Sequence, residues 1–337
     1  MRRTFVALAA LVVTAAIVAG LGAAGPTTPA ASAAKADVTL SLVGYAVPRE
    51  ALGAVIKAWQ QTPAGRDVDF QQSYGASGDQ ARAVAAGLKA DIVHLSTALD
   101  VDVIVKAGLI DPKWNRQSYK GIATNSIVVF AVRDGNPKKI RRWQDLARPG
   151  VEIVTPNPFS SGAAKWNVLA AYGAMRKLGK TDKQGQDFVL RMFRNVVSQD
   201  TSGRNATNTF LSGKGDVFIT YENEARLAKL PYVIPKQTLL IEAPIAVLKN
   251  SENRAKAEQF MRFTRTPQAQ RIFAQYGYRP LIPSVYNQFI KQYPKRPGVF
   301  KIDDRYLGGW TAANAKWFDP KKGIMVRVNK AVGGPTG

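Results

Sequence analysis

Short apolar runs alternate with amphipathic segments along the chain from residue 38 onward. VTLSLVGY at residues 38–45 is typical of a buried strand, and REALGAVIKAWQQ at residues 49–61 places its apolar side chains on one face of a helix. The pattern continues with the strand VDFQQSY, the helix DQARAVAAGLKA and the strand DIVHLS. Strands that alternate with helices at this spacing predict parallel βαβ units and an α/β fold.

A second series of elements begins with NSIVVFAVRDGNP, an apolar strand followed by a turn that ends at Pro137. The chain has 337 residues, more than one hydrophobic core usually supports, so we expect about two domains. The later helices are expected near residues 163–178, 184–193, 253–264 and 267–276, and the later strands at residues 215–221 and 238–249.

Residues 1–36 have the pattern of a secretory signal peptide. Arg2 and Arg3 precede an apolar run over residues 5–24, and small residues with Ala-x-Ala sites end at Ala33 or Ala36. The apolar run is long enough to span a bilayer, so an uncleaved anchor is the alternative. Because the chain has no cysteine, attachment to lipid through a cysteine after the signal is excluded. We expect a soluble mature protein in the periplasm or at the cell-envelope exterior.

The net charge of +23 first suggests a nucleic-acid partner, because strongly basic proteins are attracted to phosphate backbones. However, the basic residues are spread along the whole sequence instead of forming an arm or a stripe, and export argues against a genomic partner. We therefore expect no nucleic-acid partner. A basic surface that suits an acidic envelope, or that attracts small anions over a distance, explains the charge better.

Three Ser-Gly pairs are candidates for a binding site. Each lies at a predicted helix start: Ser77-Gly78, Ser161-Gly162 and Ser202-Gly203. A helix N-terminus exposes unpaired backbone N–H groups and attracts anions. Serine adds a hydroxyl donor, and glycine lets the backbone approach a ligand closely. One such turn is ordinary helix capping. Three of them in an α/β protein indicate an anion site, because ligands bind where the carboxyl ends of the strands meet helix starts.

Several stretches resemble, in the correct order, the periplasmic sulfate-binding proteins of ABC-type sulfate/thiosulfate importers. The resemblance covers about residues 40–318, and it is carried by SYGASGDQARAV, GNPKKIRRWQDLARPGVEIVTPNP, SSGAAKWNVLAAYGA, TNTF, GDVFITYENEA and IDDRYLGGW. It implies the two-lobed type II periplasmic-binding-protein fold, with a mostly parallel sheet flanked by helices in each lobe and the ligand in the cleft between them.

The same resemblance implies how the lobes divide the chain. Lobe 1 comprises residues 37–124 and 241–337, and lobe 2 comprises residues 125–240. The strands at residues 215–221 and 238–249 are expected to cross between the lobes. The implied role is that of a monomeric receptor without a cofactor, which delivers its ligand to a membrane permease.

The resemblance also implies a set of ligand-binding residues. Backbone N–H groups and one serine hydroxyl are expected to hold sulfate, with no cation in direct contact. The implied ligand-binding residues are Ala46, Ser77, Ser161, which also gives its hydroxyl, Gly162, Ala163, Gly203 and Tyr221. Behind them, the resemblance implies a supporting role for Arg49, Glu50, Gly78 and Arg204.

Three positions depart from the family's pattern. Ala46 stands in place of an aspartate that uses its backbone N–H, and Tyr221 stands in place of a tryptophan. Asp79 replaces a lysine, and we expect it to point away from the ligand as an acid in the first helical turn. Thiosulfate, or another tetrahedral oxyanion such as molybdate, therefore stays open as an alternative ligand.

A site made only of donors favours sulfate over phosphate, because monohydrogen phosphate carries a proton that needs an acceptor. Asp79 and Asp200 are the nearby acids in the three turns, and either one inside the pocket would weaken the sulfate interpretation.

A different class, an exported enzyme acting on sulfate or phosphate esters, finds little support in the sequence. The chain has one histidine, His94, and no cysteine, so the usual nucleophile triads and soft metal sites are excluded. LGKTDKQG lacks the first glycine of a phosphate-binding P-loop and follows a helix instead of a strand. We therefore expect a binding protein and not an enzyme.

Overall fold

Strands and helices alternate throughout residues 38–336, the part of the chain that the computed structural model describes. The predicted signal peptide lies outside the described residues. The first elements are β1 (Val38–Tyr45), α1 (Arg49–Gln60), β2 (Val68–Gly75), α2 (Ser77–Ala85), β3 (Ile92–His94), α3 (Ala98–Lys106), the short helices Trp114–Arg116 and Ser118–Gly121, and β4 (Ile122–Val132).

The middle of the chain follows the predicted alternation. After the short helix Trp143–Ala147 come β5 (Ile153–Pro156), α4 (Gly162–Lys177), α5 (Asp182–Phe193), β6 (Val196–Asp200), α6 (Gly203–Leu211), β7 (Val217–Tyr221), α7 (Glu222–Leu227) and β8 (Tyr232–Val233). The remaining elements are β9 (Thr238–Val247), α8 (Arg254–Phe263), α9 (Pro267–Gln275), α10 (Pro283–Gln288), β10 (Val299–Phe300), α11 (Gly309–Ala313), the short helix Asn314–Phe318 and α12 (Ile324–Val332).

The strands of the described residues form one continuous sheet in the order β2-β1-β3-β9-β4-β7-β5-β6. β1 pairs in parallel with β2 and β3, and β5 pairs in parallel with β6 and β7. We call β2, β1 and β3 the first half-sheet, and β7, β5 and β6 the second half-sheet. The parallel pairing within each half-sheet confirms the predicted α/β architecture.

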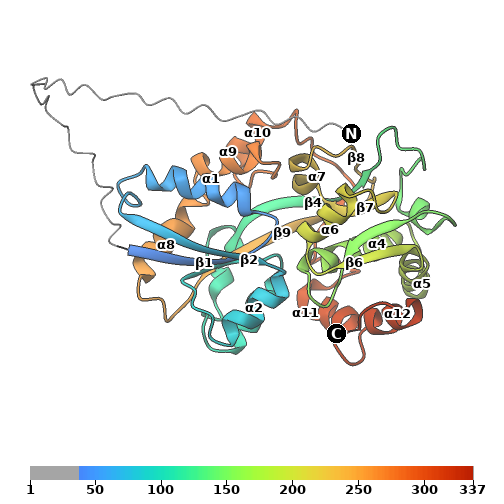
Figure 1. Cartoon of the computed structure of the whole chain (residues 1–337), viewed down its shortest axis with the longest axis horizontal. Coiled ribbons are helices and arrows are strands. Elements are labelled where there is room, and N and C mark those ends of the chain that lie inside the picture. Colours follow the sequence, from blue (N-terminus) through green and yellow to red (C-terminus); the bar gives the residue numbers. More distant parts are fainter. Residues whose placement is uncertain (1–37, 337) are drawn as a thin grey trace, which may run out of the picture. The chain divides into compact units, whose positions relative to one another are not determined.

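Two long antiparallel strands join the half-sheets. The first half of β4 pairs with β9 and its second half pairs with β7, while the end of β9 pairs with β3. In Figure 1, β4 and β9 run through the middle of the view, between β1 and β2 on one side and β6 and β7 on the other. Of the two strands expected to cross between the lobes, β9 joins the half-sheets together with β4, whereas β7 lies within the second half-sheet. β7 has only five residues, and all of them pair within the second half-sheet or with β4.

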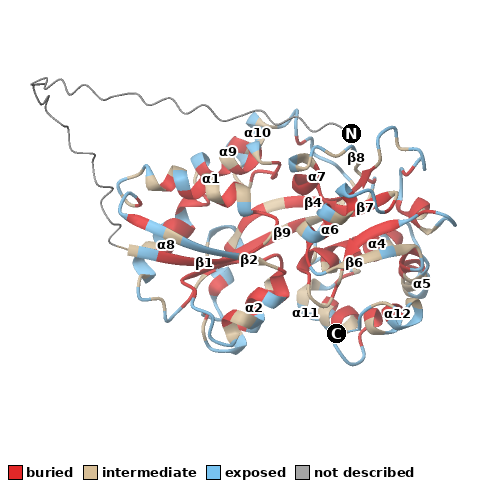
Figure 2. Cartoon of the chain, in the orientation of Figure 1, coloured by how far each residue is buried: buried red, intermediate tan, exposed pale blue. Residues whose placement is uncertain are grey.

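The hydrophobic core follows this division, with buried strands between layers of half-exposed helices (Figure 2). α1, α8 and α9 pack on one face of the first half-sheet around Trp59 and Phe260. On the second half-sheet, a larger cluster includes Trp143 and Trp166. The C-terminal residues Trp317 and Met325 also belong to this second cluster.

The packing of the C-terminal segment bears on the lobe boundaries. α12 contacts α5, and Phe300 lies 2.4 Å from where a Cβ on Gly173 of α4 would stand. α12 and Phe300 are thus packed on helices that were assigned to lobe 2, although α11 between them also contacts α3 of lobe 1. The division into two lobes stays a prediction, and this packing argues for placing the C-terminal segment with the second lobe.

Candidate functional site

Three helices begin where the Ser-Gly pairs predicted. α2 begins at Ser77 after β2, α4 begins at Gly162 after β5, and α6 begins at Gly203 after β6. The residue before each start is in an extended conformation, as is usual for a helix N-cap. The first N–H groups of each helix therefore point out of the carboxyl end of a strand, and they have no acceptor within the helix.

These helix starts lie next to one another although they come from different half-sheets. The Gly78 N–H of α2 donates to the Ser160 carbonyl in the turn before α4 at 3.0 Å. A Cβ on Gly203 of α6 would lie 3.4 Å from the Ala163 Cβ and 3.2 Å from Val47, which follows Ala46. The three Ser-Gly turns and the turn after β1 are thus brought together.

Five backbone N–H groups at this place have no acceptor among residues 38–336. We call them the donor cluster: the N–H groups of Ala46, Ser77, Gly162, Ala163 and Gly203. Ser77 is 2% exposed and Ala163 5% exposed, and the two glycines are buried, so water reaches these four groups poorly, whereas Ala46 is half-exposed. Because buried N–H groups are costly to leave unpaired, this arrangement is suited to an anion.

Ser161 differs from the expected donor pattern. Its N–H donates to the Asn157 carbonyl at 2.9 Å, so this group is already used within the turn. Its hydroxyl does not cap α4, although the residue is 2% exposed. In this structure, Ser161 can therefore offer its hydroxyl but not its N–H.

Ser96 and Asp100, which the sequence analysis did not single out, complete the surroundings of the donor cluster. The Ser77 hydroxyl donates to Asp100 Oδ2 at 2.7 Å and accepts from the Ser96 N–H at 2.9 Å. Lys165 Nζ lies 3.4 Å from Asp100 Oδ1. Thr97 caps α3 by accepting from the Asp100 N–H, so the Thr-x-x-Asp pattern after the strand DIVHLS was the signal for a fourth strand-to-helix turn.

Asp100 is a buried carboxylate beside the donor cluster, since it is 2% exposed and its Oδ2 lies 3.1 Å from where a Cβ on Gly162 would stand. Ser77 engages one of its oxygens, and Lys165 faces the other. The acids considered from the sequence behave differently. Asp79 is exposed and paired with Arg82, and Asp200 accepts from Ser198 and Thr209.

Tyr221 closes one wall of the site at the end of β7. Its hydroxyl oxygen lies 2.7 Å from Ser96 Oγ, and the residue is 1% exposed. Burial raises the pKa of Tyr221 well above its usual value, so the phenol keeps its proton at neutral pH. The ring therefore brings a hydroxyl and no charge to the site.

Arg204 ties the elements behind the donor cluster together. Its guanidinium pairs with Glu50 of α1 at 2.6 Å and with Glu224 of α7 at 2.7 Å, and it also donates to the Val47 carbonyl. Hydrogen bonding to Glu50 raises the pKa of Arg204 further above its usual value. Burial raises the pKa of the Glu224 carboxyl, against the opposing effect of Arg204. Arg49 instead lies over the ring of Tyr74, 5.2 Å from its centre.

Neither a metal site nor a membrane span is found in the described part of the chain. Residues 38–336 contain no group of three or more metal-ligating side chains that could hold an ion. None of the helices in this range is long and apolar enough to cross a membrane.

Two half-sheets joined by crossing strands, with buried helix-start donors between them, define the chain as an α/β solute-binding protein. The profile of the bacterial extracellular solute-binding protein family matches residues 40–279. The chain belongs to this family and, within it, to the sulfate-binding proteins, as the sequence resemblance predicted.

Individual relatives agree with this assignment. The chain is 38% identical to a sulfate-binding protein of Synechocystis sp., over 90% of this chain and 89% of the relative. It is 33% identical to a thiosulfate-binding protein of Pseudomonas aeruginosa, over 85% of this chain and 91% of the relative. The solved structure of the sulfate-binding protein SubI from Mycobacterium tuberculosis H37Rv is similar with a TM-score of 0.81 and 44% identity, covering 84% of this chain and all of that one. These relatives are binding proteins, and this chain is not an enzyme.

Proposed function

We propose that this protein captures sulfate with the donor cluster and delivers it to an ABC-type importer. The observation that carries the proposal is the set of five N–H groups, from four turns and four of them buried, that lie together without an acceptor among the described residues. Helix N-termini favour negative charge, and hydrogen bonds to an ion are stronger than those between neutral groups. The names of the relatives point to the same ligand class.

Sulfate fits better than phosphate because the groups that face the site are mainly donors. Sulfate carries no proton at neutral pH, so each of its oxygens can accept. Asp100, a buried carboxylate beside the cluster, is held by Ser77 and Lys165. The positive charge of Lys165 offsets the repulsion that a lone carboxylate would exert on a dianion.

Thiosulfate is the second candidate ligand, and the similarity to a thiosulfate-binding protein favours it. The two anions differ in one terminal atom, which is sulfur in thiosulfate, and the phenol at Tyr221 is the group that departs from the family's pattern. We propose that the choice between the two anions depends on the wall formed by Tyr221 and Ser96.

We also propose that the half-sheets belong to two lobes that close over the anion. β4 and β9 would act as the hinge, since β9 pairs with β3 of the first half-sheet, β4 pairs with β7 of the second half-sheet, and the two strands pair with each other. The contacts of Gly78 with Ser160 and of Ser96 with Tyr221 join the two parts directly. The binding residues named from the sequence stay a proposal, with Ser96 and Asp100 added.

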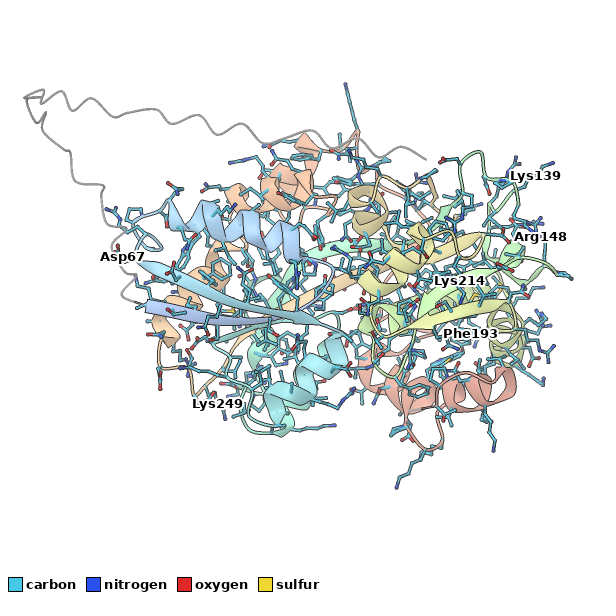
Figure 3. The ribbon with its side chains drawn as sticks, viewed as in Figure 1. Asp67, Lys139, Arg148, Phe193, Lys214 and Lys249 are labelled. Carbon is cyan, nitrogen blue, oxygen red and sulfur yellow. The ribbon has the colours of Figure 1, made fainter. Side chains whose placement is uncertain are left out.

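The proposed location is outside the cytoplasmic membrane, after cleavage of the signal peptide. The chain has no cysteine for lipid attachment, and we propose a monomer. Exposed basic side chains lie at both ends of the view: Lys139, Arg148 and Lys214 lie toward one end and Lys249 toward the other (Figure 3). A dispersed positive surface supports the attraction of small anions better than the binding of a nucleic acid.

Calorimetric titration of the ligand-stripped protein, residues 37–337, tests the proposal. Sulfate, thiosulfate, molybdate and phosphate are compared at constant ionic strength. One-to-one binding that is tightest for sulfate is expected, with little dependence on salt because the donors are buried and neutral. If none of the four anions binds, the donor cluster does not have this function.

A further inference from the structure

We infer that the hydroxyl groups of Ser96 and Tyr221 act as one pair that donates a hydrogen bond to the bound anion and can also accept a hydrogen bond from it. The site would therefore admit monoprotonated tetrahedral oxyanions, such as hydrogen phosphate, in addition to sulfate. This inference rests on the proposed function of the site. Its starting observation is the distance of 2.7 Å between Ser96 Oγ and the Tyr221 hydroxyl oxygen.

The pair has one more hydroxyl proton than its own hydrogen bond uses. Two hydroxyl groups carry two protons, and only one of them can lie on the line between the oxygens. Among residues 38–336, neither hydroxyl makes another hydrogen bond. Both residues are 1% exposed, so the second proton lacks both a protein acceptor and ready access to water. A buried donor needs a partner, and an oxygen of the bound anion can provide it.

The position of Ser96 is fixed, which keeps the pair at the edge of the donor cluster. The Ser96 N–H donates to Ser77 Oγ at 2.9 Å, and the Ser96 carbonyl accepts from Trp166 Nε1 at 2.9 Å. A Cβ on Gly162 would lie only 2.6 Å from Ser96 Cβ. Ser96 is thus held against the start of α4, whose N–H groups are proposed to bind the anion.

The chemistry of the pair differs from that of an indole N–H, which the family resemblance would place at residue 221. An indole only donates, whereas each hydroxyl also has lone pairs that accept. A ligand O–H can donate to one oxygen of the pair while the hydrogen bond within the pair is kept. Asp100 is less suited to this task, because Ser77 and Lys165 already engage its carboxylate.

The discriminating experiment compares sulfate and phosphate binding in the wild type and in the double variant Ser96→Ala, Tyr221→Trp, which replaces the pair by a donor. The variant is expected to lower the affinity for phosphate by about tenfold more than the affinity for sulfate, because the proton of the bound phosphate is left without an acceptor. An equal change for both anions would overturn the inference. So would a wild type that binds sulfate but shows no binding of phosphate.

A smaller change guards against misfolding of the tryptophan variant. Ser96→Ala, Tyr221→Phe removes both hydroxyls without adding volume, and it should weaken sulfate by about tenfold or more. Unchanged sulfate affinity in this variant would show that the pair does not touch the anion. Tyr286→Phe serves as the matched control, because it removes a hydroxyl of α10 that donates to the Tyr293 carbonyl, outside the site. Failure of the proposed function is distinguishable, since the wild type would then bind no oxyanion.

Discussion

The substitution Gly162→Ala adds a single methyl group. It tests whether the contact between the two half-sheets at the donor cluster is needed for sulfate binding. A Cβ there would lie 2.6 Å from Ser96 Cβ and 2.7 Å from Ser96 Oγ. The clash with Ser96 Cβ cannot be relieved by rotating the serine side chain. Gly162 needs no left-handed backbone conformation, so alanine fits the local chain and disturbs mainly this contact, with a weaker crowding of Asp100 Oδ2 at 3.1 Å.

The size of the effect follows from the overlap. Overpacking by one methyl group costs about 1–3 kcal/mol, which corresponds to about 5-fold to about 150-fold in affinity. The cost falls on the closed arrangement, because Ser96 follows β3 and Gly162 follows β5. With the proposed closure, the unliganded protein relieves the clash in its open form, and alanine at a helix start restricts the unfolded chain. We therefore expect Gly162→Ala to weaken sulfate binding without lowering the unfolding temperature of the unliganded protein.

Calorimetric titration and thermal unfolding, with and without sulfate, measure both quantities. Gly53→Ala in α1 is the matched control, since a Cβ there would meet nothing within 4 Å. The control should keep the wild-type affinity and gain about 0.4–1 kcal/mol of stability. Wild-type sulfate affinity in Gly162→Ala would refute the reasoning, because it would mean that the anion is bound without the close approach of Ser96 to α4.

Three further predictions concern single residues. Ser161→Ala should weaken sulfate binding by about 10-fold to about 150-fold in a titration, because a hydrogen bond to a charged group is worth about 1.5–3 kcal/mol, and unchanged affinity would remove this hydroxyl from the site. Arg204→Met should lower the free energy of unfolding in urea by about 3 kcal/mol, because it leaves the buried Glu224 carboxylate unpaired; adding Glu224→Gln should recover part of this loss, and no recovery would contradict the explanation. Burial lowers the pKa of His94 from 6.5 to about 4, so only the unfolded chain binds this proton between those values and stability should fall as the pH is lowered across the interval. His94→Gln should reduce that slope by about 1.4 kcal/mol per pH unit in denaturant titrations, and an unchanged slope would contradict the assignment.

Local patterns in the sequence predicted the α/β alternation and the three helix starts well. A Ser-Gly pair after a strand places a capping residue and a small residue where a helix must begin, and this information is contained within a few residues. The same reasoning missed α3, although Thr97 and Asp100 form a recognisable capping pattern. The omission mattered because Asp100 brings a carboxylate to the edge of the site.

Long-range contacts could not be predicted in this way. Ser96 and Tyr221 are 125 residues apart in the chain, and only the folded sheet brings their hydroxyls together. The crossing role of β4 depends on pairing along its full eleven residues, which no local pattern reveals. The packing of the C-terminal helix on α5 likewise depends on tertiary structure.

The two shared strands, β4 and β9, have a consequence for how the protein unfolds. β9 pairs with β10 at its start, with β4 over residues 240–244 and with β3 at its end, and β4 continues into the pairing with β7. If one half-sheet unfolded alone, the strands of the other half would lose backbone hydrogen-bond partners. The amides at the centre of β4 and β9 should therefore exchange with solvent only when the whole described structure opens, in one cooperative event and not in two successive steps.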